Sequence, residues 1–178
     1  FQPLLDFGDP ILAFVAPQSY IVNQQAFDAG LPAGHRWESR AHQLTGLSDE
    51  TIEAVLSRVA DLPGDFTSVY FDTGGGAIGR VDPSATAYPQ REQPYGFHIM
   101  AGWISPDQDD EITAWTLDLH EALVPFASGG VYVNTMGTGE EDRVPAAYNA
   151  NYARLIELKR KWDPENLFRG NHNIPPQG

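Results

Sequence analysis

Tyr95-Gly-Phe-His-Ile-Met-Ala-Gly-Trp103 is the stretch of sequence that decides the fold of this chain. It is mostly apolar and lies between turn-rich segments, and it therefore predicts the longest β-strand of the chain. Residues 107–123 follow and predict a long amphipathic helix, because apolar side chains recur there at helical spacing. These side chains are Ile112, Trp115, Leu119 and Leu123. A long strand followed by such a helix indicates a sheet that packs helices on one of its faces.

The segments on both sides of this pair continue the mixture of strands and helices. Strands are expected over residues 11–16, 35–40, 66–71, 77–81 and 131–134, and helices over residues 19–29, 49–62 and 145–162. Ser48 marks the start of the second helix, because its hydroxyl can cap free backbone N–H groups. Since turns rather than helices join the strands in the middle of the chain, the expected fold class is α+β. We expect a mostly antiparallel β-sheet with helices packed on one face.

The composition of the chain limits what it can bind. Its 178 residues suggest one domain, and its net charge of −13 repels phosphate backbones and anionic bilayers. No nucleic acid or membrane partner is therefore expected, and no apolar run approaches the ~20 residues that span a bilayer. The absence of cysteine excludes a disulfide scaffold and thiolate chemistry from this chain. Composition leaves the compartment open, with the cytoplasm favoured over secretion.

The glycines of residues 74–79 and the five histidines are candidates for binding a dinucleotide or a metal. Gly74, Gly76 and Gly79 have the G-x-G-x-x-G spacing of a dinucleotide-binding loop, but the following Arg80-Val-Asp-Pro83 is unsuited to open the long helix that such a loop needs. A bulged pair of strands, in which glycines allow close backbone packing, is the favoured interpretation. The five histidines lack the short paired spacing of a zinc site, so no bound metal is expected.

Two places in the sequence could carry acid–base chemistry. His98 interrupts the apolar strand, and it lies either on the wetter face of the sheet or in a cavity as an acid or base. His120, in contrast, is expected on a solvated helix face. Tyr148 and Tyr152 are four residues apart on the last expected helix and so share a face, with Asn151 beside it. From their spacing alone, these two tyrosines are expected to be aromatic residues at the edge of the core.

The end of the chain adds a resemblance to a known family. Tyr148-Asn-Ala-Asn-Tyr-Ala-Arg-Leu155, Trp162-Asp-Pro-Glu-Asn-Leu-Phe168 and Asn171-His-Asn-Ile-Pro-Pro176 resemble the C-terminal signature of the berberine bridge enzyme-like flavoproteins. These are FAD-linked oxidoreductases of the vanillyl-alcohol-oxidase superfamily. Segments upstream resemble further family motifs, namely 75–81, 85–91 and 128–134. The sequence departs from the family pattern at His172, Asn149 and Gln90, where members usually carry Gln, Gly and His.

The resemblance also implies a domain organisation. Residues 1–131 resemble the substrate-binding domain of an FAD-linked oxidase, and residues 132–178 resemble the berberine-like C-terminal segment. No stretch resembles the N-terminal FAD-binding domain of the family, and Phe1 stands where a whole chain would begin with Met. We therefore expect a C-terminal portion of a longer enzyme, with the fold of a substrate-binding domain. This portion is expected to be inactive without the FAD-binding domain.

The implied activity is oxidation of a small hydroxylated or amine metabolite in bacterial secondary metabolism. A base would assist hydride transfer to FAD, O2 would be the acceptor, and the FAD-binding domain of the same protein would hold most of the cofactor. Two alternatives remain open, a non-catalytic small-ligand-binding module and a partner subunit of a separate flavin chain. The site residues that the resemblance implies fall into three groups: catalytic Tyr148, Tyr152 and His98; substrate-binding Trp37, His98 and Tyr148; and cofactor-binding Asn151, Asn171 and Asn173.

Overall fold

The computed structural model describes residues 2–7, 15–26 and 28–177, and the chain divides into two compact units, residues 1–33 and 34–178. In the first unit, two short helices, α1 (Gln2–Leu5) and α2 (Tyr20–Gln24), precede a 3₁₀ turn at Asp28–Gly30. Ser19 caps α2 by accepting a hydrogen bond from the Val22 amide, but the helix ends earlier than predicted. Most of the predicted strand over residues 11–16, namely residues 11–14, lies outside the described residues.

The second unit is built on a three-stranded antiparallel sheet. Strand β3 (Tyr95–Trp103) lies in the centre, between β1 (Arg36–Leu44) and β2 (Ser68–Thr73). The strand predicted over residues 95–103 is confirmed at both ends, and it pairs along its whole length with β1 and along most of it with β2. Phe97 lies opposite His42 on one side and Phe71 on the other, which fixes the face that each side chain takes.

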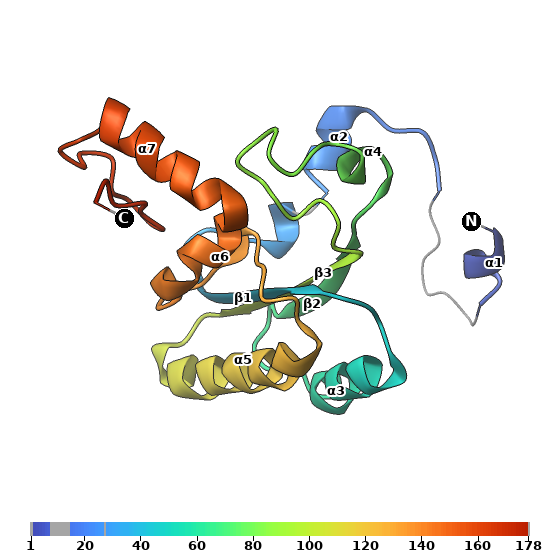
Figure 1. The fold of residues 1–178 in the computed structure, drawn as a ribbon. Helices are drawn as coiled ribbons and strands as arrows, with labels where there is room; N and C mark the ends of the chain where they lie inside the picture. Colours follow the sequence, from blue (N-terminus) through green and yellow to red (C-terminus); the bar gives the residue numbers. More distant parts are fainter. Residues whose placement is uncertain (1, 8–14, 27, 178) are drawn as a thin grey trace. The chain divides into compact units, whose positions relative to one another are not determined.

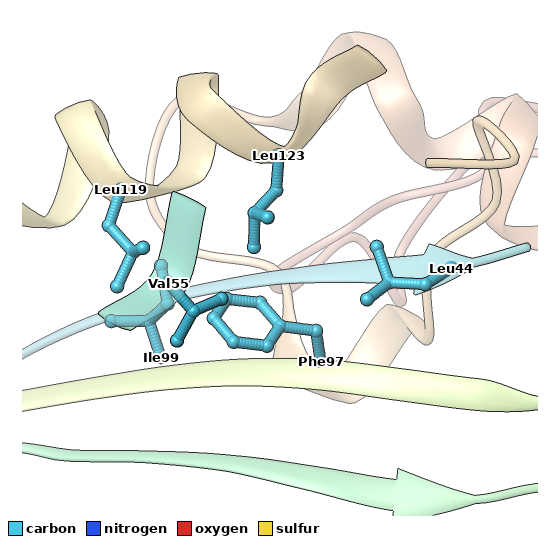
Figure 2. Close-up of a cluster of buried hydrophobic side chains, with 6 residues drawn as sticks. All are labelled: Leu44, Val55, Phe97, Ile99, Leu119 and Leu123. Atoms are coloured by element: carbon cyan, nitrogen blue, oxygen red, sulfur yellow. The ribbon is translucent and has the colours of Figure 1, made fainter. Parts of the chain in front are cut away.

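Two helices cover one face of this sheet. Figure 1 shows α3 (Asp49–Val59) and α5 (Asp109–Leu123) side by side on the same side of the strands. Side chains from the helices and the sheet meet in a buried cluster, shown in Figure 2 and formed by Leu44, Val55, Phe97, Ile99, Leu119 and Leu123. Burying one such side chain contributes about 1.5–3 kcal/mol, so this cluster is the main source of stability for the fold. The α+β class is therefore confirmed, with α3 and α5 on one face.

The C-terminal segment packs against the opposite face of β1. Helix α6 (Val144–Tyr148) lies over that face in Figure 1, and α7 (Tyr152–Trp162) continues beyond it. A second apolar cluster joins them to the sheet through Ala41, Val131, Met136, Val144 and Ala147. The prediction of one continuous helix over residues 145–162 is wrong, because Asn149 adopts a left-handed φ of 47° and a 3₁₀ turn separates the two helices.

Two predicted strands are also wrong. Residues 77–81 do not resume the sheet after β2, because Gly75 has a φ of 92° and a short helix, α4 (Gly76–Gly79), follows it. The bulged strand pair favoured for the glycines is thus absent from this described part of the chain. Residues 131–134 form no strand either: the Gln43 amide donates to the Gly130 carbonyl, after which the chain leaves the edge of β1 and makes a 3₁₀ turn at Val133–Thr135. Within the described ranges, no helix is long and apolar enough to cross a bilayer.

Candidate active site

A cavity of about 730 Å³ opens beside the first half of β1, within the second unit. This volume lies in the range of small-molecule pockets. Its walls come from β1, from the loop that follows Val131, from the end of α6 and from the tail. The lining residues are Trp37, Glu38, Ser39, Val133, Asn134, Met136, Gly137, Thr138, Glu141, Tyr148, Gly170, Asn171 and His172. Two residues expected to bind substrate, Trp37 and Tyr148, therefore lie in the same cavity as Asn171, which was expected to bind the cofactor.

The Trp37 indole lies across Gly102, its neighbour on β3. A Cβ atom at position 102 would overlap the indole ring, so only glycine leaves room for this orientation. The ring also lies 6.4 Å from that of Phe66 at a tilted angle. An aromatic face held in this way gives the cavity a flat apolar wall, which suits the carbon skeleton of a substrate.

Tyr148 ends α6 and is half-buried. Burial, with a smaller effect from the neighbouring Tyr132, raises the pKa of its phenol above the usual value of 10. The Tyr132 hydroxyl in turn accepts a hydrogen bond of 2.7 Å from Asn134 Nδ2. At neutral pH Tyr148 is therefore a protonated phenol that can donate a hydrogen bond into the cavity. It can accept a proton only after losing its own.

The loop between Met136 and Glu141 is held against β1 by buried charges. Arg40 donates to the Thr138 carbonyl at 3.0 Å, and the Glu140 carboxylate accepts from the Gly137 amide at 2.6 Å. Arg40 also pairs with Glu38, whose pKa is raised chiefly by burial. A Cβ atom at position 137 would overlap the Arg40 guanidinium, so a glycine is needed where the loop crosses it. The Arg40 guanidinium and the Glu140 carboxylate thus fix one wall of the cavity.

Two histidines extend this buried network towards α5. The rings of His42 and His120 stack at 4.0 Å, and burial lowers the pKa of His42 to about 4 and that of His120 to about 3. His42 Nε2 donates to the His120 carbonyl, while Arg143 donates to His120 Nε2, so both rings are neutral. The prediction that His120 is solvated is wrong: its helix face packs on β1 and the charged loop.

His98 lies elsewhere on the sheet and does not line the cavity. Its ring stacks on Tyr70 at 4.8 Å, and its Nε2 atom lies 3.0 Å from the Asp72 carboxylate. Nδ1 is buried without a hydrogen-bond partner among the described residues. A ring covered in this way can orient the exposed Asp72 carboxylate, and the catalytic and substrate-binding roles expected of His98 stay predictions.

The other site residues implied by the resemblance, Asn151, Tyr152 and Asn173, are not among the residues that line the cavity. Asn151 is buried, and its Nδ2 atom donates to the carbonyls of Pro83 and Thr86 at 2.8 and 3.0 Å, so only its Oδ1 atom is left for another ligand. Tyr152 is half-buried against the second apolar cluster, away from the cavity lining. Asn173 lies in the tail, and the Asn171 carbonyl accepts its backbone amide.

The tail fits a hydrogen-bonding group that the chain does not itself supply. His172 Nδ1 and Asn173 Oδ1 are buried, yet neither has a hydrogen-bond partner in the part of the chain that the structure describes. Buried polar atoms are nearly always paired, so the Asn173 Oδ1 acceptor suits a cofactor or substrate with N–H or O–H groups, as FAD has, and His172 Nδ1 can accept or donate according to its tautomer. No group of acidic, histidine or cysteine side chains suitable for a metal occurs within the described residues.

Sequence reasoning missed several residues that line the cavity. Ser39, Asn134 and Glu141 carry ordinary polar or acidic side chains that belong to no motif of the sequence analysis. His172 did carry a signal, because it departs from the glutamine of the family pattern. Nothing in the local sequence shows that the loop lies against β1, since that depends on the buried charges around Arg40.

The second unit thus combines an antiparallel sheet covered by helices with a substrate-sized cavity that has an aromatic wall and a phenol. The comparisons with known proteins assign this fold to the domains of FAD-linked oxidases. Residues 131–175 match the family "Berberine and berberine like". The chain is thus a relative of the berberine bridge enzyme-like FAD-linked oxidoreductases. The domain boundary predicted at residues 131 and 132 stays a prediction.

Individual relatives support this assignment. The chain is 35% identical to the uncharacterized FAD-linked oxidoreductase YvdP of Bacillus subtilis over 129 residues, which cover 72% of the chain and 29% of that protein. It is 28% identical to aclacinomycin-N/aclacinomycin-A oxidase of Streptomyces galilaeus, covering 58% of the chain and 22% of the oxidase. The crystal structure of glycopeptide hexose oxidase DBV29 with teicoplanin superposes with a TM-score of 0.72 at 26% identity, covering 80% of the chain and 33% of that structure. The chain spans about a third or less of the length of these proteins.

Proposed function

We propose that this chain forms the substrate-binding part of an FAD-dependent oxidoreductase that oxidises a small hydroxylated or amine metabolite. The observation that carries the proposal is the meeting of Trp37, Tyr148 and Asn171 in one cavity. The resemblance implies substrate-binding roles for Trp37 and Tyr148 and a cofactor-binding role for Asn171, and the three come from segments more than 20 residues apart in the chain. Relatives named FAD-linked oxidoreductases and oxidases agree with redox chemistry at this cavity.

The cofactor would be held mainly by a flavin-binding part that this chain does not span. From this chain, Asn171 and Asn173 in the tail and Asn151 Oδ1 are the groups that would contact FAD. When bound, FAD supplies the two-electron acceptor for a hydride, with O2 as the final oxidant. The chain itself supplies the walls of the cavity and the proton chemistry, and those walls exclude water from one side of the substrate.

Tyr148 is the group of this chain that would move a proton. It donates its phenol hydrogen to the substrate in the resting state, and it acts as a base only in its deprotonated form. Since burial raises the pKa of Tyr148, the deprotonated fraction is small at neutral pH and increases as the pH rises. The titratable groups that share the cavity with it are Glu38, Glu141 and His172. Substrate oxidation is therefore expected to accelerate with rising pH.

The test is replacement of Tyr148 in the complete flavoprotein. Tyr148→Phe removes one oxygen atom and should lower kcat by about 10²–10⁴-fold, the usual contribution of general acid–base catalysis, without loss of bound flavin. Tyr152→Phe is the matched control, because Tyr152 packs in the second apolar cluster rather than in the cavity. Flavin content is read from its visible absorbance on the same samples. Unchanged turnover in Tyr148→Phe, or an equal loss in both variants, would reject Tyr148 as the base.

A further inference from the structure

His98 is a buried side chain with one unused hydrogen-bonding atom. Its exposed fraction is 4%, and its Nδ1 atom has no hydrogen-bond partner in residues 2–7, 15–26 and 28–177. Because Phe97 and Ile99 on either side of it point into the cluster under α3 and α5 (Figure 2), His98 lies on the opposite face of the sheet. Burying a polar atom without a partner is unfavourable, so Nδ1 suits a hydrogen-bonding group that comes from outside the chain.

The carboxylate of Asp72 fixes the orientation of the His98 ring. Asp72 Oδ2 lies 3.0 Å from His98 Nε2, and Asp72 Oδ1 accepts a hydrogen bond of 2.8 Å from the Gly96 amide. A Cβ atom at position 96 would overlap Asp72 Oδ1, so glycine leaves the room that this carboxylate needs. The Tyr70 ring stacks on the imidazole at 4.8 Å. A carboxylate tied to the backbone and an aromatic ring thus hold the imidazole in place.

The same carboxylate decides which nitrogen of the neutral His98 ring carries the hydrogen. An ionised carboxylate can only accept hydrogen bonds, so His98 Nε2 donates to Asp72. In a neutral imidazole the other nitrogen then has no hydrogen and offers a lone pair. Asp72 therefore makes His98 Nδ1 an acceptor for an O–H or N–H donor.

His98 lies one residue pair beyond the wall of the 730 Å³ cavity. Ser39, which lines the cavity, is paired with Met100, and the next pair on the same face of the sheet is Ala41 with His98. Two residues along a strand span about 7 Å, so a ligand that extends this far past Ser39 comes within reach of His98. Tyr70, which covers the ring, is 41% exposed, and its hydroxyl is 3.7 Å from Met100 Sδ, a weak acceptor. Little therefore holds the phenol over the imidazole.

We propose that Asp72 is a positioning residue of this oxidoreductase, which holds His98 Nδ1 as the hydrogen-bond acceptor for a hydroxyl or amine group of the substrate. This rests on the proposed function and adds a second polar contact to it, about 7 Å along the sheet from the cavity wall. Tyr148 would donate to one polar group of the substrate, and His98 would accept from another after Tyr70 turns aside. The site would therefore select metabolites that carry two such groups.

Asp72→Asn tests the proposal, because it keeps the shape of the side chain and reverses one hydrogen bond. The Gly96 amide still needs an acceptor, so the new amide oxygen takes that place and the NH₂ group faces His98 Nε2. Nε2 must then accept, and the hydrogen of the neutral ring moves to Nδ1.

Nitrogen NMR of the complete flavoprotein with isotope-labelled histidine distinguishes the two tautomers, at about pH 8, where imidazole in water is neutral. His98→Gln identifies the signals of His98, and the signals of the buried His42 and His120 rings report that each variant is folded. We expect hydrogen on Nε2 in the unmodified protein and on Nδ1 in Asp72→Asn. Asp61→Asn, the same change of charge at an exposed residue, should leave the tautomer as it is. Hydrogen on Nδ1 in the unmodified protein, or an unchanged tautomer in Asp72→Asn, would overturn the proposal.

Two probes of equal charge test the contact with a ligand. Protonated benzylamine has N–H donors and no acceptor, whereas benzyltrimethylammonium has the same charge and no donor. Benzylamine should shift the Nδ1 signal of His98, and Asp72→Asn should weaken its binding by at least about tenfold more than that of benzyltrimethylammonium, because a hydrogen bond to a charged group is lost. A Nδ1 signal that benzylamine leaves in place, or an equal loss for both probes, contradicts the proposal.

Flavin absorbance separates this inference from the proposed function. A complete protein that binds no flavin contradicts the function, and the tautomer of His98 is still measured in it. Bound flavin together with an unchanged tautomer in Asp72→Asn contradicts this inference alone.

Discussion

The stacked pair of His42 and His120 makes the stability of this chain depend on pH. Both side chains are buried, and their pKa values fall to about 4 and about 3, mainly because burial disfavours the charged imidazole. In the unfolded chain the same groups titrate near 6.5. Below that pH the unfolded state binds more protons than the native state does. Stability is therefore greatest above pH 6.5 and falls as the pH drops towards the native pKa values.

The size of the loss follows from the same numbers. At pH 5 the unfolded His42 is about 1.5 pH units below its pKa and the native ring is still mostly neutral, so the native state loses about 2 kcal/mol. His120 acts in the same direction, which gives roughly 2–4 kcal/mol for the pair. Glu38, whose pKa is raised in the native state, opposes a part of this loss. For a domain with a total stability of about 5–15 kcal/mol, the effect is large.

Urea unfolding at about pH 7.5, 6.5 and 5 measures the loss, with tryptophan fluorescence as the probe. His42→Gln keeps a hydrogen-bond donor near the His120 carbonyl and removes one titrating ring, so it should remove about half of the pH dependence. His35→Gln is the control, since His35 packs edge-on against Phe66 outside this network. A free energy of unfolding that is equal at pH 7.5 and pH 5, or a pH dependence that His42→Gln leaves unchanged, would refute the argument.

Two further predictions concern the core and the cavity. Leu119→Ala should lower the free energy of unfolding by about 2–5 kcal/mol, because it opens a hole in the fully buried cluster under α5; urea unfolding should show a loss well above that of the exposed Leu117→Ala. Gly102→Ala should displace the Trp37 indole and raise KM in the complete flavoprotein by about tenfold, a loss of about 1.4 kcal/mol in binding, while flavin content stays constant. An unchanged KM would show that the indole is not a wall of the substrate site.

The parts of the fold that could be predicted from the sequence are those set by local interactions. Strand β3 was predicted at its exact ends because its apolar run has turns on both sides, and Ser48 was identified as a cap whose hydroxyl accepts from the Thr51 amide at 3.2 Å. The helix break at Asn149 was not predicted, although Asn149 stands where the family pattern has Gly, and both residue types adopt a positive φ more readily than others.

The candidate site likewise divides into residues that could be predicted from the sequence and residues whose place depends on tertiary packing. Trp37, Tyr148 and Asn171 were nominated from the resemblance to the family and line one cavity, whereas His98 and Tyr152 do not line it. Strand periodicity could place His98 on a face of the sheet, but not under Tyr70, because that contact depends on the register between β2 and β3. The burial of His120 depends likewise on a loop that lies distant in sequence.

The acid sensitivity and the shape of the cavity have a common physical origin. Arg143 donates to His120 Nε2, pairs with Glu140 and donates to the Ala41 carbonyl at 3.2 Å, so one guanidinium joins the histidine pair to the loop that walls the cavity. Protonation of His120 turns its Nε2 acceptor into a donor. It also places the imidazolium next to the Arg143 guanidinium, so that two positive charges repel each other in a buried environment. We expect the response to be a local movement of residues 136–143, because the contacts of Arg40, Glu140 and Arg143 that hold them to β1 meet at His120. As the pH falls, the cavity wall is therefore expected to loosen before the cluster under α5 unfolds, and binding at the cavity should be lost at a higher pH than the native sheet.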